Sequence, residues 1–374
     1  MTQRLYIQPL TLVSGPQAVE GDALRLGGSM VWASQFAVVV RDGARVTQRL
    51  IASPRTMPAT LEQLGPDLAA EGAAQWADLS KVHAPLQCGE RTIRLDQPQV
   101  MGVLNVTPDS FSDGGQFMDD PAAMQAQAAA MHEAGAAIID IGGESTRPGA
   151  AAVWEGDEIK RVVPAIELCV RMGAAVSVDT RRPAVMQAAL DAGAHILNDV
   201  SALRHDPRSL GFAASSGRPV ILMHAPGPSN AAAQDLHANG DYASVVFDVF
   251  DWLRERRDAA IAAGIAREAI VLDPGIGFGK SLADNLALMN ALPLFHALGQ
   301  PLLLGASRKR MIGALSNEAA AHQRLGGSLA LALRGMDAGY HMLRVHDVFE
   351  TVQARNVWRG MRDAALTDFA GLVG

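Results

Sequence analysis

Residues 100–105 read Val-Met-Gly-Val-Leu-Asn, a short apolar run that ends in a polar residue. An apolar run of this length is typical of a strand that is buried on both faces, as in a parallel sheet covered by helices. The pattern recurs along the chain, and the repeats are separated by segments long enough for helices. The predicted strands are Val100–Leu104, Ala137–Ile141, Ala175–Val178, His195–Leu197, Val220–Met223, Ile270–Leu272, Leu302–Gly305 and Met342–Val345.

Eight strand and helix units predict an α/β fold of the closed (β/α)8 type, the TIM barrel, in preference to an open doubly wound sheet. Polar residues follow every one of the predicted strands. A single polar residue after a strand is usually a helix cap or part of a solvated loop. Polar residues at all eight ends indicate one shared site, because the carboxyl ends of barrel strands meet on one face.

The amino-terminal part of the chain lacks this alternation of apolar runs and helix-sized segments. We expect residues 1–85 to form a small amino-terminal α+β extension of unknown role, and residues 86–374 to form the barrel domain. In the extension, Asp42-Gly43 between two β-rich runs predicts a tight hairpin turn. Leu61–Leu79 is expected to be helical, and Cys88–Leu95 to form a second hairpin that plugs the amino-terminal end of the barrel.

The composition excludes several classes of protein. Of 374 residues 49% are hydrophobic and 19% are charged, which predicts a folded core, and the net charge of -7 gives no basic surface for nucleic acid. The two cysteines, Cys88 and Cys169, are too few and too far apart for a disulfide framework or a cysteine metal site. No apolar stretch reaches membrane-spanning length. We therefore expect a cytoplasmic protein that binds small molecules, with no nucleic acid or membrane partner.

Two carboxylates, Asp179 and Asp273, each end an apolar run. They could cap the following helix, or they could accept hydrogen bonds from the amino and ring N–H groups of a heterocycle. Asn198, after another run, could do either. The glycine-rich stretch Asp273–Lys280 does not have the spacing of a P-loop, which argues against a nucleotide triphosphatase.

Cations gather at the last two strand ends, in Ser307–Arg310 and Arg344–His346. Side-chain charge beside a helix start favours anion binding, so these segments predict a phosphate-bearing substrate, with a solvated charge run as the alternative. Asn105 stands between a strand and a Ser/Asp/Gly-rich loop. Its amide oxygen could cap a turn or bind a hard cation such as Mg²⁺.

With these motifs together, the chain from about Pro85 to Trp358 resembles the dihydropteroate synthases of folate biosynthesis, a family of sulfonamide targets. The matching segments, in the family's order, are Asn105–Gly115, Asp140–Gly149, Val178–Thr180, Asn198–Val200, Asp273–Lys280, Ser307–Lys309 and Arg344–Val348. The resemblance implies a transferase that condenses 6-hydroxymethyl-7,8-dihydropterin pyrophosphate with 4-aminobenzoate to give 7,8-dihydropteroate and pyrophosphate. It also implies Mg²⁺ as cofactor and a homodimer.

The resemblance also implies roles for individual residues. The expected pterin-binding set is Asp179, Asn198, Met223, Asp273, Phe278 and Lys309. Pyrophosphate is expected at Asn105, Arg344 and His346, with Asn105 as a ligand of the metal ion. The expected 4-aminobenzoate set is Phe111, Thr146, Arg147, Pro148 and Ser307. The catalytic set implied is Asn105, Asp179, Asp273, Lys309, Arg344 and His346, with the pterin deep in the barrel and the anion at its rim.

The chain departs from the family in two places. Met223–Ser229 replaces a Met-rich, Gln-containing turn, and the family assigns no role to the amino-terminal extension. Two alternatives stay open: a catalytically silent pterin-binding paralogue, and a methyltetrahydrofolate methyltransferase. The methyltransferase would not need the two cationic strand ends, and the retention of Asn105, Lys309 and His346 argues against loss of activity.

Overall fold

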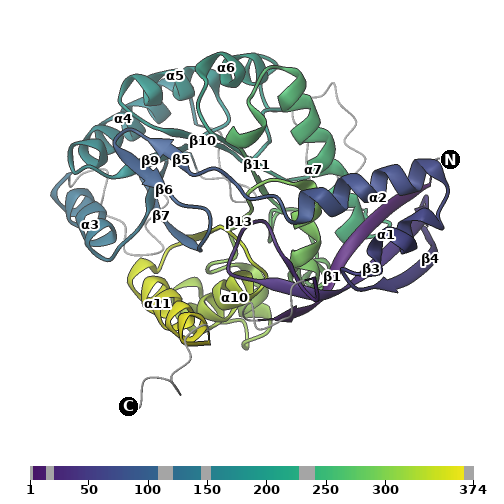
Figure 1. The fold of residues 1–374 in the computed structure, drawn as a ribbon. Coiled ribbons are helices and arrows are strands. Elements are labelled where there is room, and N and C mark those ends of the chain that lie inside the picture. The colour runs from purple at the N-terminus through teal and green to yellow at the C-terminus, as the bar shows by residue number, and fades with distance from the viewer. Residues whose placement is uncertain (1–2, 14–20, 108–120, 145–152, 227–240, 366–374) are drawn as a thin grey trace, which may run out of the picture.

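The chain folds into a parallel barrel with a smaller antiparallel sheet at its side (Figure 1). The computed structural model describes residues 3–13, 21–107, 121–144, 153–226 and 241–365. The eight barrel strands, in sheet order, are β12 (Ile270–Asp273), β11 (Val220–Met223), β10 (Ile196–Asp199), β9 (Ala175–Asp179), β8 (Ile138–Gly142), β7 (Gln99–Asn105), β14 (Met342–Val345) and β13 (Leu303–Leu304). The ends of this order meet in a parallel bridge between Leu272 and Leu302, so the predicted TIM barrel is confirmed.

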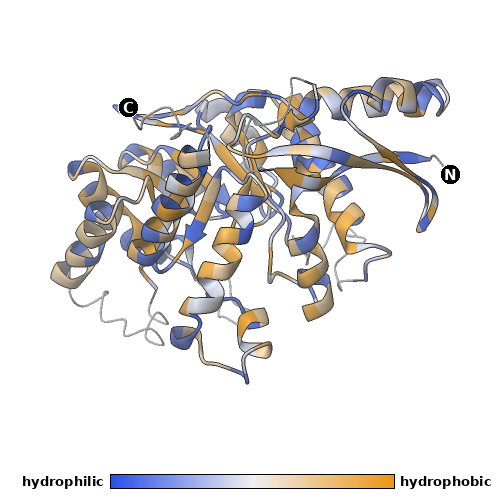
Figure 2. Ribbon diagram, turned by 60° about the horizontal axis from the view of Figure 1, so that its bottom comes forward, coloured by the Kyte–Doolittle hydropathy of each residue, from blue (hydrophilic) through white to orange (hydrophobic). Residues whose placement is uncertain are grey.

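Helices follow the strands and cover the outside of the barrel (Figure 1). They are α3 (Pro121–Glu133), α4 (Glu155–Arg171), α5 (Pro183–Asp191), α6 (Ser209–Ser216), α7 (Val245–Ala262), α8 (Leu282–Ala291), α9 (Arg310–Ala314), α10 (Leu325–Asp337) and α11 (Val348–Ala365), with 3-10 helices η2 (Arg267–Ala269), η3 (Leu292–Leu298) and η4 (Ala321–Gln323). Figure 2 shows that hydrophobic residues dominate the central strands, whereas hydrophilic residues recur along the helices. No helix in the described ranges is both long and apolar enough to cross a membrane.

All eight apolar runs form strands, with small differences at their ends. Strand β13 is shorter than predicted, since it spans Leu303–Leu304 rather than Leu302–Gly305. Leu302 is outside the ladder because its N–H donates to the imidazole Nδ1 of His341 at 3.0 Å.

The barrel interior changes from apolar to polar along its axis. Its amino-terminal end holds one buried apolar residue from each strand: Met101, Ile138, Ala175, Ile196, Ile221, Val271, Leu303 and Met342. The hairpin of β5 (Leu86–Cys88) and β6 (Arg91–Ile93) packs on this layer through Leu86 and Ile93. The predicted plug is therefore present, but its strands begin and end two residues before the predicted Cys88–Leu95. Two residues further along each strand the side chain faces inward again, and there the interior includes Asp140, Ser177, Asn198 and Arg344.

The amino-terminal module, by which we mean the described residues 3–13 and 21–85, is an antiparallel sheet with two helices. Its strands are β1 (Arg4–Val13), β2 (Leu24–Arg25), β3 (Trp32–Asp42) and β4 (Arg45–Ala52), and its helices are α1 (Met57–Glu62) and α2 (Pro66–Leu79). The β3–β4 hairpin turns at the predicted Asp42-Gly43. In Figure 1 the module lies beside α7. The division of the chain at residue 85 stays a prediction.

The expectation of one helix over Leu61–Leu79 was wrong in extent, because α1 ends at Glu62 and α2 begins at Pro66. Gly65, which precedes α2, has a φ of +70° that glycine adopts without steric cost. Proline starts a helix readily but cannot donate the backbone hydrogen bond that a continuing helix would need. The Gly65-Pro66 pair therefore separates the two helices.

Candidate active site

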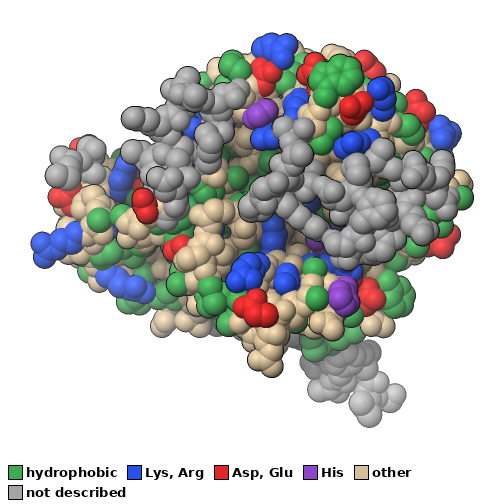
Figure 3. All heavy atoms as spheres, turned by 180° about the vertical axis from the view of Figure 1, so that it is seen from behind, with side chains coloured by type: hydrophobic (Ala, Val, Ile, Leu, Met, Phe, Trp, Pro, Cys, Tyr) green, Lys and Arg blue, Asp and Glu red, His purple; other side chains and the backbone are tan. Residues whose placement is uncertain are grey.

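Four adjacent barrel strands place predicted site residues at one level. The strand register pairs Asn105 with Gly142, Gly142 with Asp179, and Asp179 with Asn198. Gly142 lies between two of these side chains, since a Cβ there would be 3.4 Å from Asn105 Oδ1 and 3.8 Å from Asp179 Oδ2, in ordinary van der Waals contact. Figure 3 shows a hollow in the middle of the face opposite to that of Figure 1, with Lys, Arg and His side chains gathered around it.

At the barrel centre, Arg344 binds two carboxylates. Its Nε donates to Asp140 Oδ2 at 2.6 Å, and its Nη2 donates to Asp179 Oδ2 at 2.7 Å. Asn198 Nδ2 donates to the same Asp140 oxygen at 3.1 Å. Arg344 therefore lies among the residues expected to bind pterin and not apart from them at the rim.

The charges in this cluster affect one another strongly. Burial raises the pKa of Asp179, while Arg344 opposes that shift. Burial alone would lower the pKa of Arg344, but Asp140 and Asp179 raise it, so the guanidinium stays charged. Two carboxylates on one cation leave the cluster with an excess negative charge that favours a donor-rich ligand.

On the opposite side of the barrel, Asp273 and Lys309 form a second polar pair. Asp273 Oδ1 accepts the N–H of Gly275 at 2.7 Å, and burial raises the pKa of Asp273 to about 6. Lys309 stands just before α9, and burial with the nearby Arg344 lowers its pKa to about 8. Its ammonium lies 3.9 Å from the centre of the Phe278 ring, a cation–π contact.

Lys280 fixes the loop that carries Phe278. Its ammonium donates to the carbonyls of Gly275 at 2.7 Å and Phe278 at 3.1 Å, and contacts His224 Nδ1 at 2.9 Å. This Lys is a structural tie between the ends of β11 and β12. Met223, the last residue of β11, is buried beside the same loop, since a Cβ on Gly275 would lie 3.3 Å from Met223 Cγ.

The ends of β13 and β14 are joined twice. Ser307 Oγ accepts the backbone N–H of His346 at 3.2 Å and contacts His346 Nδ1 at 3.1 Å. Arg308 donates to both oxygens of Asp347, at 3.1 and 2.6 Å. The Ser307 hydroxyl can therefore donate to Nδ1, which would leave the proton of a neutral imidazole on Nε2.

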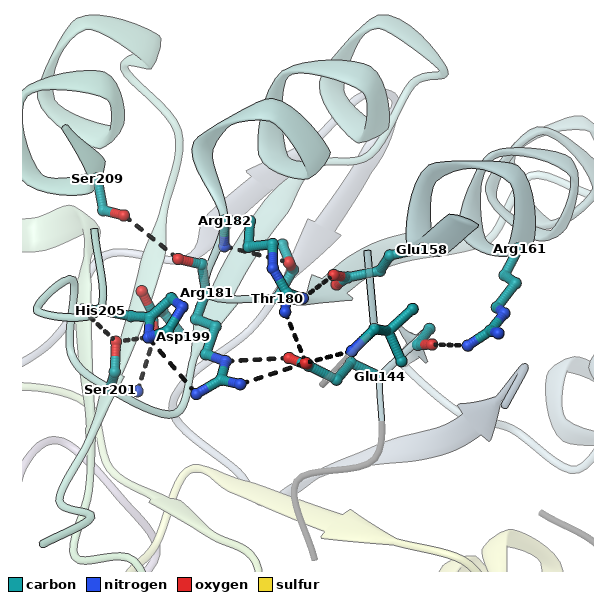
Figure 4. A network of polar contacts seen from close by, with 12 residues as sticks. Glu144, Glu158, Arg161, Thr180, Arg181, Arg182, Asp199, Ser201, His205 and Ser209 are labelled. Carbon is teal, nitrogen blue, oxygen red and sulfur yellow. Dashed lines mark hydrogen bonds and ion pairs between the residues drawn. The ribbon is translucent and has the colours of Figure 1, made fainter. Parts of the chain in front are cut away.

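Glu144 lies at the centre of a charged network beyond the end of β8 (Figure 4). Its carboxylate accepts from Arg181 Nε at 3.0 Å and from Arg182 Nη2 at 2.7 Å, and Arg182 also pairs with the buried Glu158. Although burial alone would raise the pKa of Glu144, the two arginines hold it below its usual range. The N–H of Val153 points back to Glu144 Oε1 at 3.4 Å.

Four predicted residues, Phe111, Thr146, Arg147 and Pro148, lie outside the described residues, so their positions stay predictions. The sequence analysis gave no role to Asp140, which the structure places in hydrogen-bond contact with Arg344 and Asn198. A carboxylate inside the run Ile-Ile-Asp-Ile was the available signal, because a buried charge needs a partner.

Known proteins resemble the barrel closely. The sequence model described as pterin binding enzyme matches residues 101–346. The dihydropteroate synthase of Escherichia coli is 45% identical over 267 residues, which is 71% of this chain and 92% of that protein. A Haloferax volcanii protein named probable bifunctional folylpolyglutamate synthase/dihydropteroate synthase is 48% identical over 268 residues, 72% of this chain and 31% of that protein.

Solved structures agree with the sequence comparisons. The Xanthomonas albilineans dihydropteroate synthase with 4-aminobenzoic acid has a TM-score of 0.69 and 46% identity, and the match covers 75% of this chain and 99% of that one. The same enzyme in complex with 7,8-dihydropteroate gives a TM-score of 0.66 at 44% identity, over 74% and 98% of the two chains. With its barrel, its polar centre and these matches, the chain belongs to the pterin-binding enzymes, in the family of the dihydropteroate synthases.

Proposed function

We propose that this chain is a dihydropteroate synthase. In this reaction the bond between the pterin methylene carbon and pyrophosphate breaks, the same carbon bonds to the amine nitrogen of 4-aminobenzoate, and pyrophosphate and an amine proton are released. The observation that carries the proposal is a set of polar atoms around the Arg344 cluster that make no hydrogen bond within the described residues. They are Asp179 Oδ1, Asn198 Oδ1, Asp273 Oδ2, Lys309 Nζ and Arg344 Nη1.

These atoms complement a pterin. The carboxylates of Asp179 and Asp273 can accept hydrogen bonds from its amino and ring N–H groups, and the Lys309 ammonium can donate to a ring oxygen or nitrogen. Phe278 and Met223 offer apolar contact to the ring. The methyltransferase alternative is disfavoured because it leaves the cationic ends of β13 and β14 without a ligand.

We propose that the reaction proceeds by early departure of pyrophosphate. The electron-rich pterin ring can delocalise the positive charge left on its methylene carbon, so the protein needs mainly to stabilise the leaving group and to orient the amine. Arg344 and His346 would bind the departing anion, and the carboxylates of Asp179 and Asp273 would favour the cationic ring. Ser307 would help to hold the carboxylate of 4-aminobenzoate, together with the predicted residues Phe111, Thr146, Arg147 and Pro148.

The residues fit a magnesium ion bound together with pyrophosphate. Within the described residues there is no group of three or more His, Cys, Asp or Glu that could hold a metal ion by itself. Mg²⁺ typically keeps several waters and takes few protein ligands when phosphates share it. Asn105 would supply one amide oxygen, and the ion when bound would neutralise charge on the leaving group.

We also propose a homodimer. Helix α11 carries three exposed apolar side chains, Phe349, Val357 and Met361, which are 60–63% exposed. They occupy one side of the helix, and an apolar stripe of this kind favours burial against another surface. Cys88 and Cys169 are free thiols, which fits the reducing cytoplasm that we propose as the compartment.

The test is pyrophosphate release from the pterin pyrophosphate by the purified chain with Mg²⁺, with and without 4-aminobenzoate. The proposal expects release with both substrates, and some release without 4-aminobenzoate if departure comes first. Absence of release with both substrates, despite pterin binding, would favour the silent paralogue. Strict dependence on 4-aminobenzoate would count against early departure only, and not against the overall reaction.

A further inference from the structure

The barrel is weakest where it closes. Strand β13 has two residues, Leu303–Leu304, and its contact with β12 is the isolated bridge between Leu272 and Leu302. On its other side, β13 pairs with β14 at two positions. Short ladders add few backbone hydrogen bonds, so this side should open most easily. The loop after β13 nevertheless carries Ser307 and Lys309.

A single buried histidine joins both strands to the amino-terminal module. His341 stands directly before β14 and is 1% exposed. Its Nδ1 accepts the N–H of Leu302 at 3.0 Å, and its Nε2 meets the carbonyl oxygen of Gly27 at 2.9 Å. Because Nδ1 is the acceptor, Nε2 carries the proton, and the neutral imidazole links β13, β14 and the module.

The turn at Gly27 fits tightly against two histidines of the barrel. Gly27 has a φ of +54°, and a Cβ there would lie 2.7 Å from His296 Nδ1 and 3.1 Å from His341 Cε1. His296 belongs to η3 and is fixed by a contact of 2.9 Å between its Nε2 and the carbonyl oxygen of Ala338. A side chain larger than hydrogen at position 27 would have to displace one of these rings.

The rest of the module covers the same side of the barrel. All seven residues of η3, the segment that leads toward β13, are buried, and β1 and α2 pack against it. Ionic and polar contacts surround this packing: Arg254 pairs with Glu71 at 2.6 Å, Arg267 with Asp78 at 2.9 Å, and Tyr6 donates to Asp251 at 2.6 Å. The segment matched by the family's sequence model starts at residue 101, so the module lies outside it.

We propose that the amino-terminal module is a clamp that holds the barrel closed at β12, β13 and β14, with His341 as the positioning residue. By fixing where β13 starts relative to β14, His341 sets the positions of Lys309 and Arg344, which lie further along these two strands and the loop after β13. The claim about barrel closure is independent of the reaction that we propose. One measurement in the test below, the affinity for a pterin ligand, rests on the proposed function.

The test compares two alanine substitutions in the full-length chain, Gly27→Ala and Gly65→Ala. Both glycines have a positive φ, +54° and +70°, so alanine is strained at either, but a Cβ on Gly65 would meet nothing within 4 Å. The readouts are the thermal unfolding midpoint, hydrogen exchange at Leu302 to Leu304, and the dissociation constant of a pterin ligand. Gly65→Ala therefore controls for backbone strain.

The clamp predicts that Gly27→Ala lowers the midpoint more than Gly65→Ala does. It also predicts exchange about tenfold faster at Leu302 to Leu304 and clearly weaker pterin binding. The proposal is overturned if the two variants agree in exchange and in pterin affinity, even if Gly27→Ala is the less stable. If hydrogen exchange is faster in Gly27→Ala than in Gly65→Ala but neither variant binds pterin, the result supports the clamp and contradicts the proposed function.

A second pair of variants tests His341 directly. In His341→Gln the amide keeps one acceptor and one donor, whereas His341→Leu keeps neither. The clamp predicts that the Gln variant retains most of the exchange protection and pterin affinity and that the Leu variant loses both. Equal behaviour of the two variants would show that the hydrogen bonds of His341 do not position the strands.

Discussion

Arg344 Nε donates to the fully buried carboxylate of Asp140 at 2.6 Å, across the centre of the barrel. The same guanidinium reaches Asp179 at 2.7 Å. Asp140 thus holds a cation that would otherwise be fixed by one carboxylate alone. We infer that Asp140 orients Arg344 for its ligand without contacting that ligand itself.

Asp140→Asn should reduce both stability and ligand binding. Removing one charge from a buried ion pair costs about 3 kcal/mol of unfolding free energy, because the remaining charge stays buried with fewer partners. Urea unfolding and pterin titration measure the two effects. Asp206→Asn is the matched control, since its partner Arg208 is 72% exposed and such surface pairs contribute little. An Asp140→Asn protein as stable as the control would contradict this role.

Pterin binding should weaken on acidification. Burial raises the pKa of Asp273 to about 6, so in the free protein this carboxyl group takes up a proton as the pH falls through 6. A protonated carboxyl group loses acceptor capacity, so the dissociation constant should rise by up to about tenfold per pH unit below that point. Titrations between pH 5 and 8 measure it. The Asp273→Asn variant should bind pterin weakly, and its dissociation constant should change less with pH. Tighter pterin binding by the wild-type chain at pH 5 than at pH 8 would contradict the role of Asp273 as an acceptor.

The strand order could be predicted because each barrel strand is a compact apolar run with a polar residue after it. For Asp140, the sequence could only have indicated a buried charge that needs a partner. Its pairing with Arg344 could not be predicted, because strand register decides which side chains of Ile-Ile-Asp-Ile face the barrel interior. The contacts between the amino-terminal module and the barrel could not be predicted from the sequence either. His296 and His341 occur in apolar sequence, and their contacts with Gly27 join positions about 270 and 310 residues apart. Tertiary packing of this kind leaves no local periodicity to detect.

Glu144→Gln should affect 4-aminobenzoate more than pterin. Its carboxylate neutralises Arg181 and Arg182 just before the segment with Thr146 and Arg147, to which we assign 4-aminobenzoate binding. Loss of these charge-assisted hydrogen bonds should raise the KM for 4-aminobenzoate about tenfold. Steady-state kinetics in which each substrate is varied in turn would measure the two KM values separately.

The control for this variant is Glu167→Gln, on the exposed face of α4, where Glu167 pairs with Arg171. It should leave both KM values unchanged. An equal rise in the KM for the pterin substrate in Glu144→Gln would point to general damage of the barrel rather than to one subsite.

Stability should fall in mild acid through three histidines where the module meets the barrel, namely the half-buried His83 and the buried His296 and His341. Burial lowers the pKa of His83 to about 2, of His296 to about 3 and of His341 to about 4. Above the unfolded value of about 6.5 these groups are neutral in both states and add no pH dependence. Below it the unfolded chain takes up protons that the folded chain does not, so stability declines from about pH 6.5 toward pH 4.

Lys81 and Arg267 lie close enough to His83 to affect its charge. The ring of His341 contacts those of His83 and His296, and the ring of Tyr340 contacts that of His296. His341→Gln removes one of the three titrations, so the slope of unfolding free energy against pH should decrease by about 1 kcal/mol per pH unit between pH 4.5 and 6. Chemical unfolding across that range provides the slope. His322→Gln, at an exposed position of η4, is the control, and an equal change there would rule out the explanation.

The most direct test of the proposed function is single-turnover formation of 7,8-dihydropteroate, measured by mass spectrometry with the pterin pyrophosphate, 4-aminobenzoate and Mg²⁺. Wild-type chain should give one dihydropteroate and one pyrophosphate per active site, and Lys309→Ala should be slower by at least about 100-fold. Wild-type protein that binds the pterin but forms no dihydropteroate would contradict the account and identify the chain as a pterin-binding protein without this activity.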